Sequence, residues 1–137
     1  MTIEQDIRTG RHCVFAMHVH LIFVTKYRRK VFDGDAIARL TEHFKRVAND
    51  FEAKVIECNG EDNHMHVLVE YHPKISVSSL VRSMKGVSSR MLRQERPDIA
   101  AHYYKDVLWS PSYFAASCGG APLEIIKQYV EQQNRPL

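Results

Sequence analysis

The sequence has no long apolar run, no closely paired cysteines and no strong net charge, and each absence excludes a class of protein. No apolar stretch approaches the ~18 residues that a membrane-spanning helix needs, and residues 1–11 are polar, unlike a secretory signal. The three cysteines, Cys13, Cys58 and Cys118, are far apart and form no CxxC pair, which argues against a zinc knuckle or a disulfide framework. We therefore expect a cytoplasmic protein with ordinary thiols.

The net charge of +3 is too small to indicate nucleic-acid binding by itself, but the basic residues are clustered. One cluster surrounds a tyrosine and the other recurs along a later segment: Lys26, Tyr27, Arg28, Arg29 and Lys30, then Arg82, Lys85 and Arg90. Such clusters are commonly solvated faces, and phosphate binding is the more specific alternative.

The 137 residues fit one domain, and neither an internal repeat nor a low-complexity segment divides them. Apolar periodicity predicts strands over residues 13–25, 54–58, 64–71 and 107–117, and helices over residues 36–51, 77–94 and 123–133. Either Asp33 or Asp35 could cap the first helix, and Asn59-Gly60 predicts the turn between the second and third strands, a hairpin with a loop of several residues. Pro111 suggests a bulge or an edge position in the last strand.

This order predicts an α+β fold of the ferredoxin-like (RRM-like) type, β-α-β-β-α-β, with helices on one face of an antiparallel sheet. A C-terminal helix, residues 122–134, follows the core of residues 12–118 after a flexible joint at Gly119 and Gly120. In the first strand, Val19, Leu21 and Phe23 share a wholly apolar face that should cover the core.

His64-Met65-His66 is the most informative triplet, because residues i and i+2 of a strand project to the same face. Two neutral imidazoles at this spacing can bind one divalent cation, and two surface histidines on a half-exposed strand are the plain alternative. His18 and His20 repeat the pattern on the first strand, where we expect them to be residues of the sheet face.

Tyr129 lies four residues before Gln133 in the last predicted helix, so the phenol and the amide would lie on one helical face. Packing of the tyrosine is the alternative, although Tyr129 lies beside the apolar stripe rather than in it. A phenol with a pKa near ~10 needs help to attack a phosphodiester, and a divalent cation can supply it. Two histidines and one glutamine would leave positions for water and phosphate; ligand type favours Mn²⁺, and availability favours Mg²⁺.

Over nearly its whole length the chain resembles the short transposases of the insertion-sequence 200/605 group, single-tyrosine enzymes of the HUH type. Four stretches carry the resemblance in order: HLIFVTKYRRKVF from His20, the triplet His64-Met65-His66, LWSPSYF from Leu108, and IIKQYVEQQ from Ile125. Family members often have Pro-Asp just before the triplet, where this chain has Glu61-Asp62-Asn63; Asp62 could orient an imidazole from behind the ligands.

The resemblance implies that Tyr129 cleaves single-stranded DNA and forms a 5′-phosphotyrosine, leaving a free 3′-OH that later attacks another end. It implies a divalent metal, Mg²⁺ or Mn²⁺, bound by His64, His66 and Gln133. It also implies a homodimer that recognises hairpins near the element ends, with no membrane partner. The two basic clusters are the candidates for DNA contact.

Two other functions fit the same motifs. One is a domesticated relative that nicks palindromic repeats of a host genome, which would share the triplet and the tyrosine. The other is a non-catalytic ferredoxin-like module that uses its sheet as a platform for nucleic acid, although the RNP1 pattern of such modules is absent.

Overall fold

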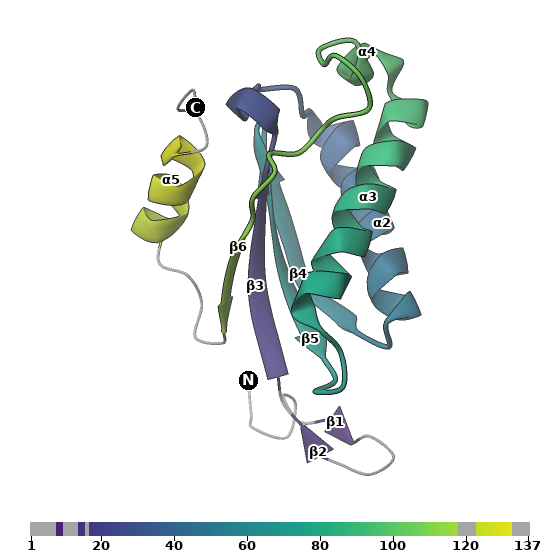
Figure 1. Ribbon diagram of the computed structural model, residues 1–137, viewed down its shortest axis with the longest axis vertical. Coiled ribbons are helices and arrows are strands. Elements are labelled where there is room, and N and C mark those ends of the chain that lie inside the picture. Colours follow the sequence, from purple (N-terminus) through teal and green to yellow (C-terminus); the bar gives the residue numbers. More distant parts are fainter. Residues whose placement is uncertain (1–7, 10–13, 16, 118–122, 133–137) are drawn as a thin grey trace.

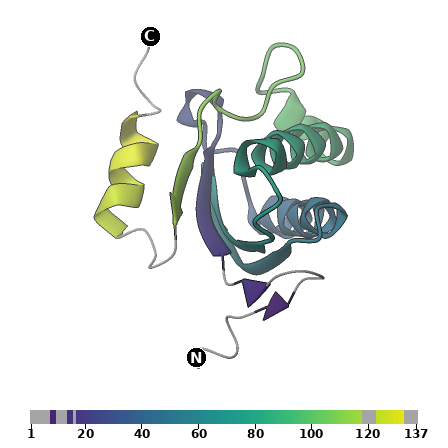
Figure 2. The same ribbon diagram turned by 60° about the horizontal axis from the view of Figure 1, so that its bottom comes forward.

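The computed structural model describes residues 8–9, 14–15, 17–117 and 123–132 (Figure 1). A four-stranded antiparallel sheet has the order β4-β5-β3-β6 and consists of β3 (Met17–Val24), β4 (Lys54–Glu61), β5 (His64–Tyr71) and β6 (Phe114–Ser117). Helices α2 (Gly34–Asp50) and α3 (Val77–Glu95) cover one face of this sheet, and α5 (Leu123–Gln132) lies on the other side (Figures 1 and 2). The α+β, ferredoxin-like fold predicted from the sequence is confirmed.

Strand β3 has two different faces, which explains why both sides of the sheet are used. Val19, Leu21 and Phe23 point into the core beneath α2 and α3, as predicted, while His18, His20 and Ile22 alternate with them. The face opposite α2 and α3, called the open face below, therefore has histidines on its central strand. This face receives α5.

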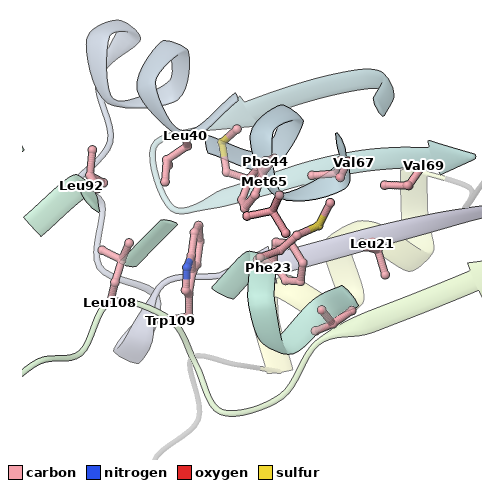
Figure 3. Close-up of a cluster of buried hydrophobic side chains, with 14 of the residues drawn as sticks. Leu21, Phe23, Leu40, Phe44, Met65, Val67, Val69, Leu92, Leu108 and Trp109 are labelled. Atoms are coloured by element: carbon pink, nitrogen blue, oxygen red, sulfur yellow. The ribbon is translucent and has the colours of Figure 1, made fainter. Parts of the chain in front are cut away.

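Aromatic rings fill the centre of the core (Figure 3). The ring of Phe23 lies 5.4 Å from that of Phe44 and 5.8 Å from that of Trp109, centroid to centroid. The Trp109 indole N–H donates a hydrogen bond to Ser88 Oγ at 3.0 Å, so the one polar atom of that side chain is satisfied. Trp109 also forms an isolated β-bridge with Thr25, which fixes the chain beyond the end of β3.

The two long helices are predicted almost to the residue, because their apolar stripes are clear. Of the two candidate caps, Asp33 is the one that caps α2, by accepting a hydrogen bond from the Ala36 N–H at 2.9 Å. Pro97 ends the α3 pattern and also begins a short helix, α4 (Pro97–Ala100), that periodicity does not predict.

The turn predicted at Asn59-Gly60 is wrong, as is the loop of several residues. Strand β4 continues to Glu61, and the turn consists of Asp62 and Asn63 alone. Gly60 lies opposite Met65 in the ladder, and a Cβ at Gly60 would overlap the Met65 sulfur. The glycine therefore serves close packing within a strand, a role that looks the same as a turn signal in the sequence.

Two strand predictions also need correction. The strand predicted over residues 107–117 is observed only as β6, at an edge of the sheet as Pro111 suggested, because residues 107–113 turn Trp109 into the core. The strand predicted over residues 13–25 is divided into β2 (Val14–Phe15) and β3, and β2 pairs with β1 (Arg8–Thr9). Within the described ranges, no helix has the length and apolar character to cross a membrane.

Candidate active site

The histidines of the triplet lie side by side on the open face. His64 pairs with Val24 of β3 and with Glu61 of β4, while His66 pairs with Ile22 and Asn59. Met65 between them is fully buried in the opposite face. The two imidazoles thus leave the same side of β5, as the period of a strand requires.

The ring of His64 is oriented by the turn that precedes it. Its Nδ1 lies 2.9 Å from Oδ1 of the buried Asn63 side chain. An amide oxygen only accepts, so Nδ1 carries the proton and Nε2 keeps its lone pair for a ligand. The sequence suggested Asp62 for this role; Asp62 instead acts through its charge, and the dominant effect on the pKa of His64 is burial, which lowers it.

His66 contacts a third histidine. His66 Nε2 lies 2.9 Å from His20 Nδ1, and the two rings stack with centroids 5.1 Å apart. Burial lowers the pKa of His66, and the neighbouring His20 and His64 lower it further. Both triplet imidazoles are thereby favoured in the neutral form that binds metal.

The register of β3 against β5 explains which strand histidines join the triplet. His20 belongs to the site, while His18 Nε2 lies 3.4 Å from Glu70 Oε2 and is held there. This contact cannot be read from the sequence around His18, because Glu70 belongs to the neighbouring strand. The alternation of residues along β3 places His18 and His20 on one face of the strand. Only the pairing of β3 with β5 shows which of the two lies beside His66.

The donor set fits a divalent cation in part. Two neutral imidazoles project together, and one has its tautomer fixed by a hydrogen bond from behind, as metal-binding histidines commonly do. Within the part of the chain that the structure describes, no third His, Cys, Asp or Glu completes a metal-binding group. Gln133, the expected third ligand, lies outside the described residues, as do Gly119 and Gly120.

Tyr129 lies over the strand next to the histidine pair. Val130 and Tyr129 of α5 pack with Ile22 and Val24, which are the cross-strand partners of His66 and His64. The Tyr129 ring is 5.7 Å from that of Phe114. Its hydroxyl shares a hydrogen bond of 2.9 Å with Ser112 Oγ. The tyrosine helix thus rests on the same face of the sheet as the triplet, within one chain.

The Tyr129 phenol is held in its protonated form. Burial raises its pKa above the ordinary value of 10, and the hydrogen bond with Ser112 only partly opposes this shift. At neutral pH the phenol therefore needs a proton acceptor, or a nearby positive charge, before its oxygen can attack.

The basic residues named from the sequence are distributed over two faces. Arg82 and Arg90 are exposed on α3, the helix layer on the other side of the sheet from the triplet. Lys85 directs its ammonium group at the backbone carbonyls of Ser110, Pro111 and Ser112, at 2.7, 3.2 and 3.3 Å. Burial lowers the pKa of Lys85. Lys85 therefore supports the loop that carries Ser112, a role that the sequence does not reveal.

The first basic cluster lies at the triplet end of β3, in the short helix η1 (Lys26–Arg28) and the residues after it. Tyr27 is 62% exposed, and Lys26 and Arg29 each lie 5.4 Å from the centre of its ring. Arg28 is half-buried and Lys30 is exposed. Phosphate and base contacts are thus possible at the triplet end of the sheet.

Comparisons with known proteins agree with this architecture. The family model described as "Transposase IS200 like" matches residues 13–133. The chain is 26% identical over 129 residues to ISDra2 transposase TnpA of Deinococcus radiodurans, covering 94% of this chain and 92% of that protein. It is 27% identical over 128 residues to the transposase for insertion sequence element IS200 of Salmonella typhimurium, covering 93% and 84%.

Solved structures show the same fold. A crystal structure of a candidate transposase from Deinococcus radiodurans superposes with a TM-score of 0.85 at 25% identity, covering 94% of this chain and 99% of the other. A REP-associated tyrosine transposase bound to a REP hairpin gives a TM-score of 0.56 at 14% identity, over 90% and 68%. The second likeness shows the fold alone.

The fold and the sequence relatives together define the class of protein, which is a transposase. The chain belongs to the IS200-like transposase family.

Proposed function

We propose that this transposase cleaves and rejoins single-stranded DNA at the ends of an insertion element through Tyr129. The observation that carries the proposal is the position of Tyr129, which packs with the cross-strand partners of His64 and His66. A phenol and two neutral imidazoles then share one face of the sheet, and a basic cluster lies beyond its triplet end. This is the arrangement expected for nucleophilic attack on a phosphodiester.

In the cleavage step, the Tyr129 oxygen attacks the phosphorus and the bond from phosphorus to the 3′ oxygen breaks. The phenol loses its proton and the 3′ oxygen gains one, so the products are a 5′-phosphotyrosine and a free 3′-OH. A 3′-OH from another end reverses the exchange and releases the tyrosine. One phosphodiester replaces another, so no nucleotide triphosphate is consumed.

His64 and His66 would hold a divalent cation, Mg²⁺ or Mn²⁺, with Gln133 as the expected third ligand. When bound, the cation neutralises charge that develops on the phosphate. The chain prepares its own ligands: burial keeps the imidazoles neutral, and Asn63 fixes the ring of His64. Ser112 orients the phenol through the bond to its hydroxyl.

The DNA partner is proposed to be a single strand carrying hairpins near the element ends, bound by a homodimer. Basic residues near the triplet, with Tyr27 exposed among them, support contact with a single strand. In this chain Tyr129 packs on its own sheet, which supports assembly of the site in cis. Exchange of the tyrosine helix with a partner would require movement at Gly119 and Gly120.

Two other functions have less support. In a non-catalytic module the sheet would be a free platform of stacking aromatics, but here α5 packs on Ile22 and Val24. A domesticated enzyme that nicks palindromes has less support because of how much of each solved structure is matched. This chain covers 99% of the Deinococcus transposase structure but 68% of the REP-associated one.

The test is formation of a covalent protein–DNA adduct on denaturing gels. Single-stranded oligonucleotides covering the genomic DNA on both sides of the gene are incubated with the full chain and Mn²⁺ or Mg²⁺. Wild type should form the adduct and Tyr129→Phe should not, while hairpin binding persists in both. Tyr113→Phe, a change in the loop before β6, is the matched control and should retain the adduct. An adduct in the Tyr129→Phe variant would refute the assignment.

A further inference from the structure

A pocket lies beyond the triplet end of β3, between η1 and the loop that follows α4. It has a volume of about 460 Å³, and three tyrosines and three basic residues line it: Tyr27, Tyr103, Tyr104, Lys26, Arg29 and Lys105. This volume falls within the ~300–1,000 Å³ typical of small-ligand sites. It is called the η1 pocket below. Val107 completes the lining, and three of its seven residues are 103–105, which the sequence motifs leave aside.

We propose that the η1 pocket binds one unpaired nucleobase, together with its phosphate, of the single strand that this transposase processes. The proposal rests on the proposed function and adds a specific subsite to it. The ligand class follows from the lining, because aromatic rings stack on bases and ammonium or guanidinium groups pair with phosphate. Only an unpaired base presents a free face, since neighbours cover the faces of bases in a duplex.

The aromatic surfaces are open at the mouth and supported deeper inside. Tyr27 is 62% exposed and Tyr104 is 84% exposed, so both rings are accessible to a ligand. Tyr103 is buried, and the Arg29 guanidinium lies 5.3 Å from its ring centre and 5.4 Å from that of Tyr27. The planar cation therefore bridges two of the rings, while the third ring, Tyr104, has the Lys105 ammonium 5.5 Å from its centre.

Backbone strain is concentrated at this pocket. Among the described residues, four non-glycine residues have a positive φ, and three of them are Tyr27, Arg28 and Lys105, at 63°, 53° and 63°. Each such conformation costs of order ~1 kcal/mol for a residue with a side chain, and it persists where surrounding contacts enforce it. The backbone of η1 and the backbone of the loop after α4 thus both adopt conformations that are unfavourable for residues with side chains.

The pocket is fixed directly to the histidine pair. The Thr25 N–H donates to the Asn63 carbonyl at 3.0 Å, and the Thr25 hydroxyl donates to the Arg29 carbonyl at 2.7 Å. The Lys26 N–H donates to the Leu108 carbonyl at 2.8 Å. Because Asn63 also orients His64, a base in the pocket would set the position of the strand relative to the triplet.

The test compares two single strands that differ only in their bases. Oligothymidylate of about 12 nucleotides, within the ~4–16 that single-strand sites span, is titrated against an abasic strand of equal length. Replacing Tyr27 and Tyr104 with Ala should weaken binding of oligothymidylate by about 5- to 100-fold. Binding of the abasic strand should not change. Tyr27→Phe and Tyr104→Phe should bind as wild type does, because both keep the stacking ring.

A charge control separates stacking from general attraction. Lys105→Ala should weaken binding of both strands, whereas Lys74→Ala, an exposed lysine paired with Glu52 far from the pocket, should change neither. The proposal is overturned if the alanine variants bind oligothymidylate as wild type does, or lose equal affinity for the abasic strand. If the covalent adduct forms through Tyr129 but replacing Tyr27 and Tyr104 with Ala does not weaken binding, only the proposal for the η1 pocket is refuted. If binding depends on the bases but no adduct forms, only the proposed function is refuted.

Discussion

At the residue scale, the position of the two triplet histidines follows from the sequence but their chemical state does not. A strand of period two is enough to place His64 and His66 on one face. The fixed tautomer of His64 depends on Asn63. The contact of His66 is with His20 of β3, two residues before the cross-strand partner of His66. Neither partner could be predicted, because both depend on a turn and a register that local patterns do not determine.

Replacement of Asn63 by Ala tests the role of that tautomer. The variant removes the acceptor for His64 Nδ1–H, so the ring can rotate or change its protonated nitrogen. We expect affinity for Mn²⁺ to fall about 10- to 100-fold, the usual effect of losing such a supporting partner. Titration followed by electron paramagnetic resonance of free Mn²⁺ measures it.

The fold should survive this change, because the Asn63 carbonyl that accepts from Thr25 belongs to the backbone. Asn49→Ala, an exposed asparagine near the end of α2, is the control and should leave Mn²⁺ affinity unchanged. Equal Mn²⁺ affinity in wild type and Asn63→Ala would show that the amide does not support a metal ligand.

At the element scale, the helices and β5 were predictable and the connections were not. Long apolar stripes define α2 and α3, and alternation defines β5 to the residue. The error at Asn59-Gly60 arose because a glycine required by a neighbouring side chain has the same appearance as a glycine in a turn. Residues 107–113 looked like a strand for a similar reason, since Trp109 is apolar to fill the core.

Gly60→Ala tests this reading of β4. The added methyl meets the Met65 sulfur and approaches the His64 carbonyl, inside a core that leaves Met65 no exposed surface. We expect the free energy of unfolding to fall by about 1–3 kcal/mol, the usual cost of overpacking. Urea unfolding followed by circular dichroism measures it.

Gly86→Ala is the matched control for that substitution. Gly86 lies in α3 with nothing within 4 Å of an added Cβ, so the change should raise the free energy of unfolding, by up to ~1 kcal/mol, through helix propensity alone. If Gly60→Ala unfolds at the same urea concentration as wild type, the close approach to Met65 has no energetic weight.

At the scale of the whole molecule, the two faces of the sheet separate stability from chemistry. The face under α2 and α3 contains the apolar core, while the open face carries the histidines and Tyr129. Residues far apart in sequence fasten the helix layer. Arg96 donates to both carboxylate oxygens of Asp33 and of Asp98, and also to Asp35, at 2.8–2.9 Å. Its guanidinium thereby joins the start of α2 to the junction of α3 and α4.

The contribution of Arg96 should depend on pH in a definite direction. Its hydrogen bonds hold the pKa values of Asp33 and Asp98 below the ordinary value of 3.8. The pKa of Asp35 is lowered first by the hydrogen bond from Arg39 and further by the one from Arg96. A lowered carboxylate pKa adds stability above 3.8, and this stability is lost as the pH falls below 3.8 through the folded-state value. Arg96→Ala should therefore have a Tm several degrees below that of wild type at pH 7, and the gap should shrink progressively below pH 3.8.

Arg96→Lys, which keeps the charge but loses the planar fork, should have a Tm between those of wild type and Arg96→Ala. Arg46→Ala, an exposed change on α2, serves as the control in thermal melts followed by circular dichroism. A gap between Arg96→Ala and wild type that stays constant from pH 7 to below pH 3.8 would show that these carboxylates do not couple to Arg96 in the folded chain.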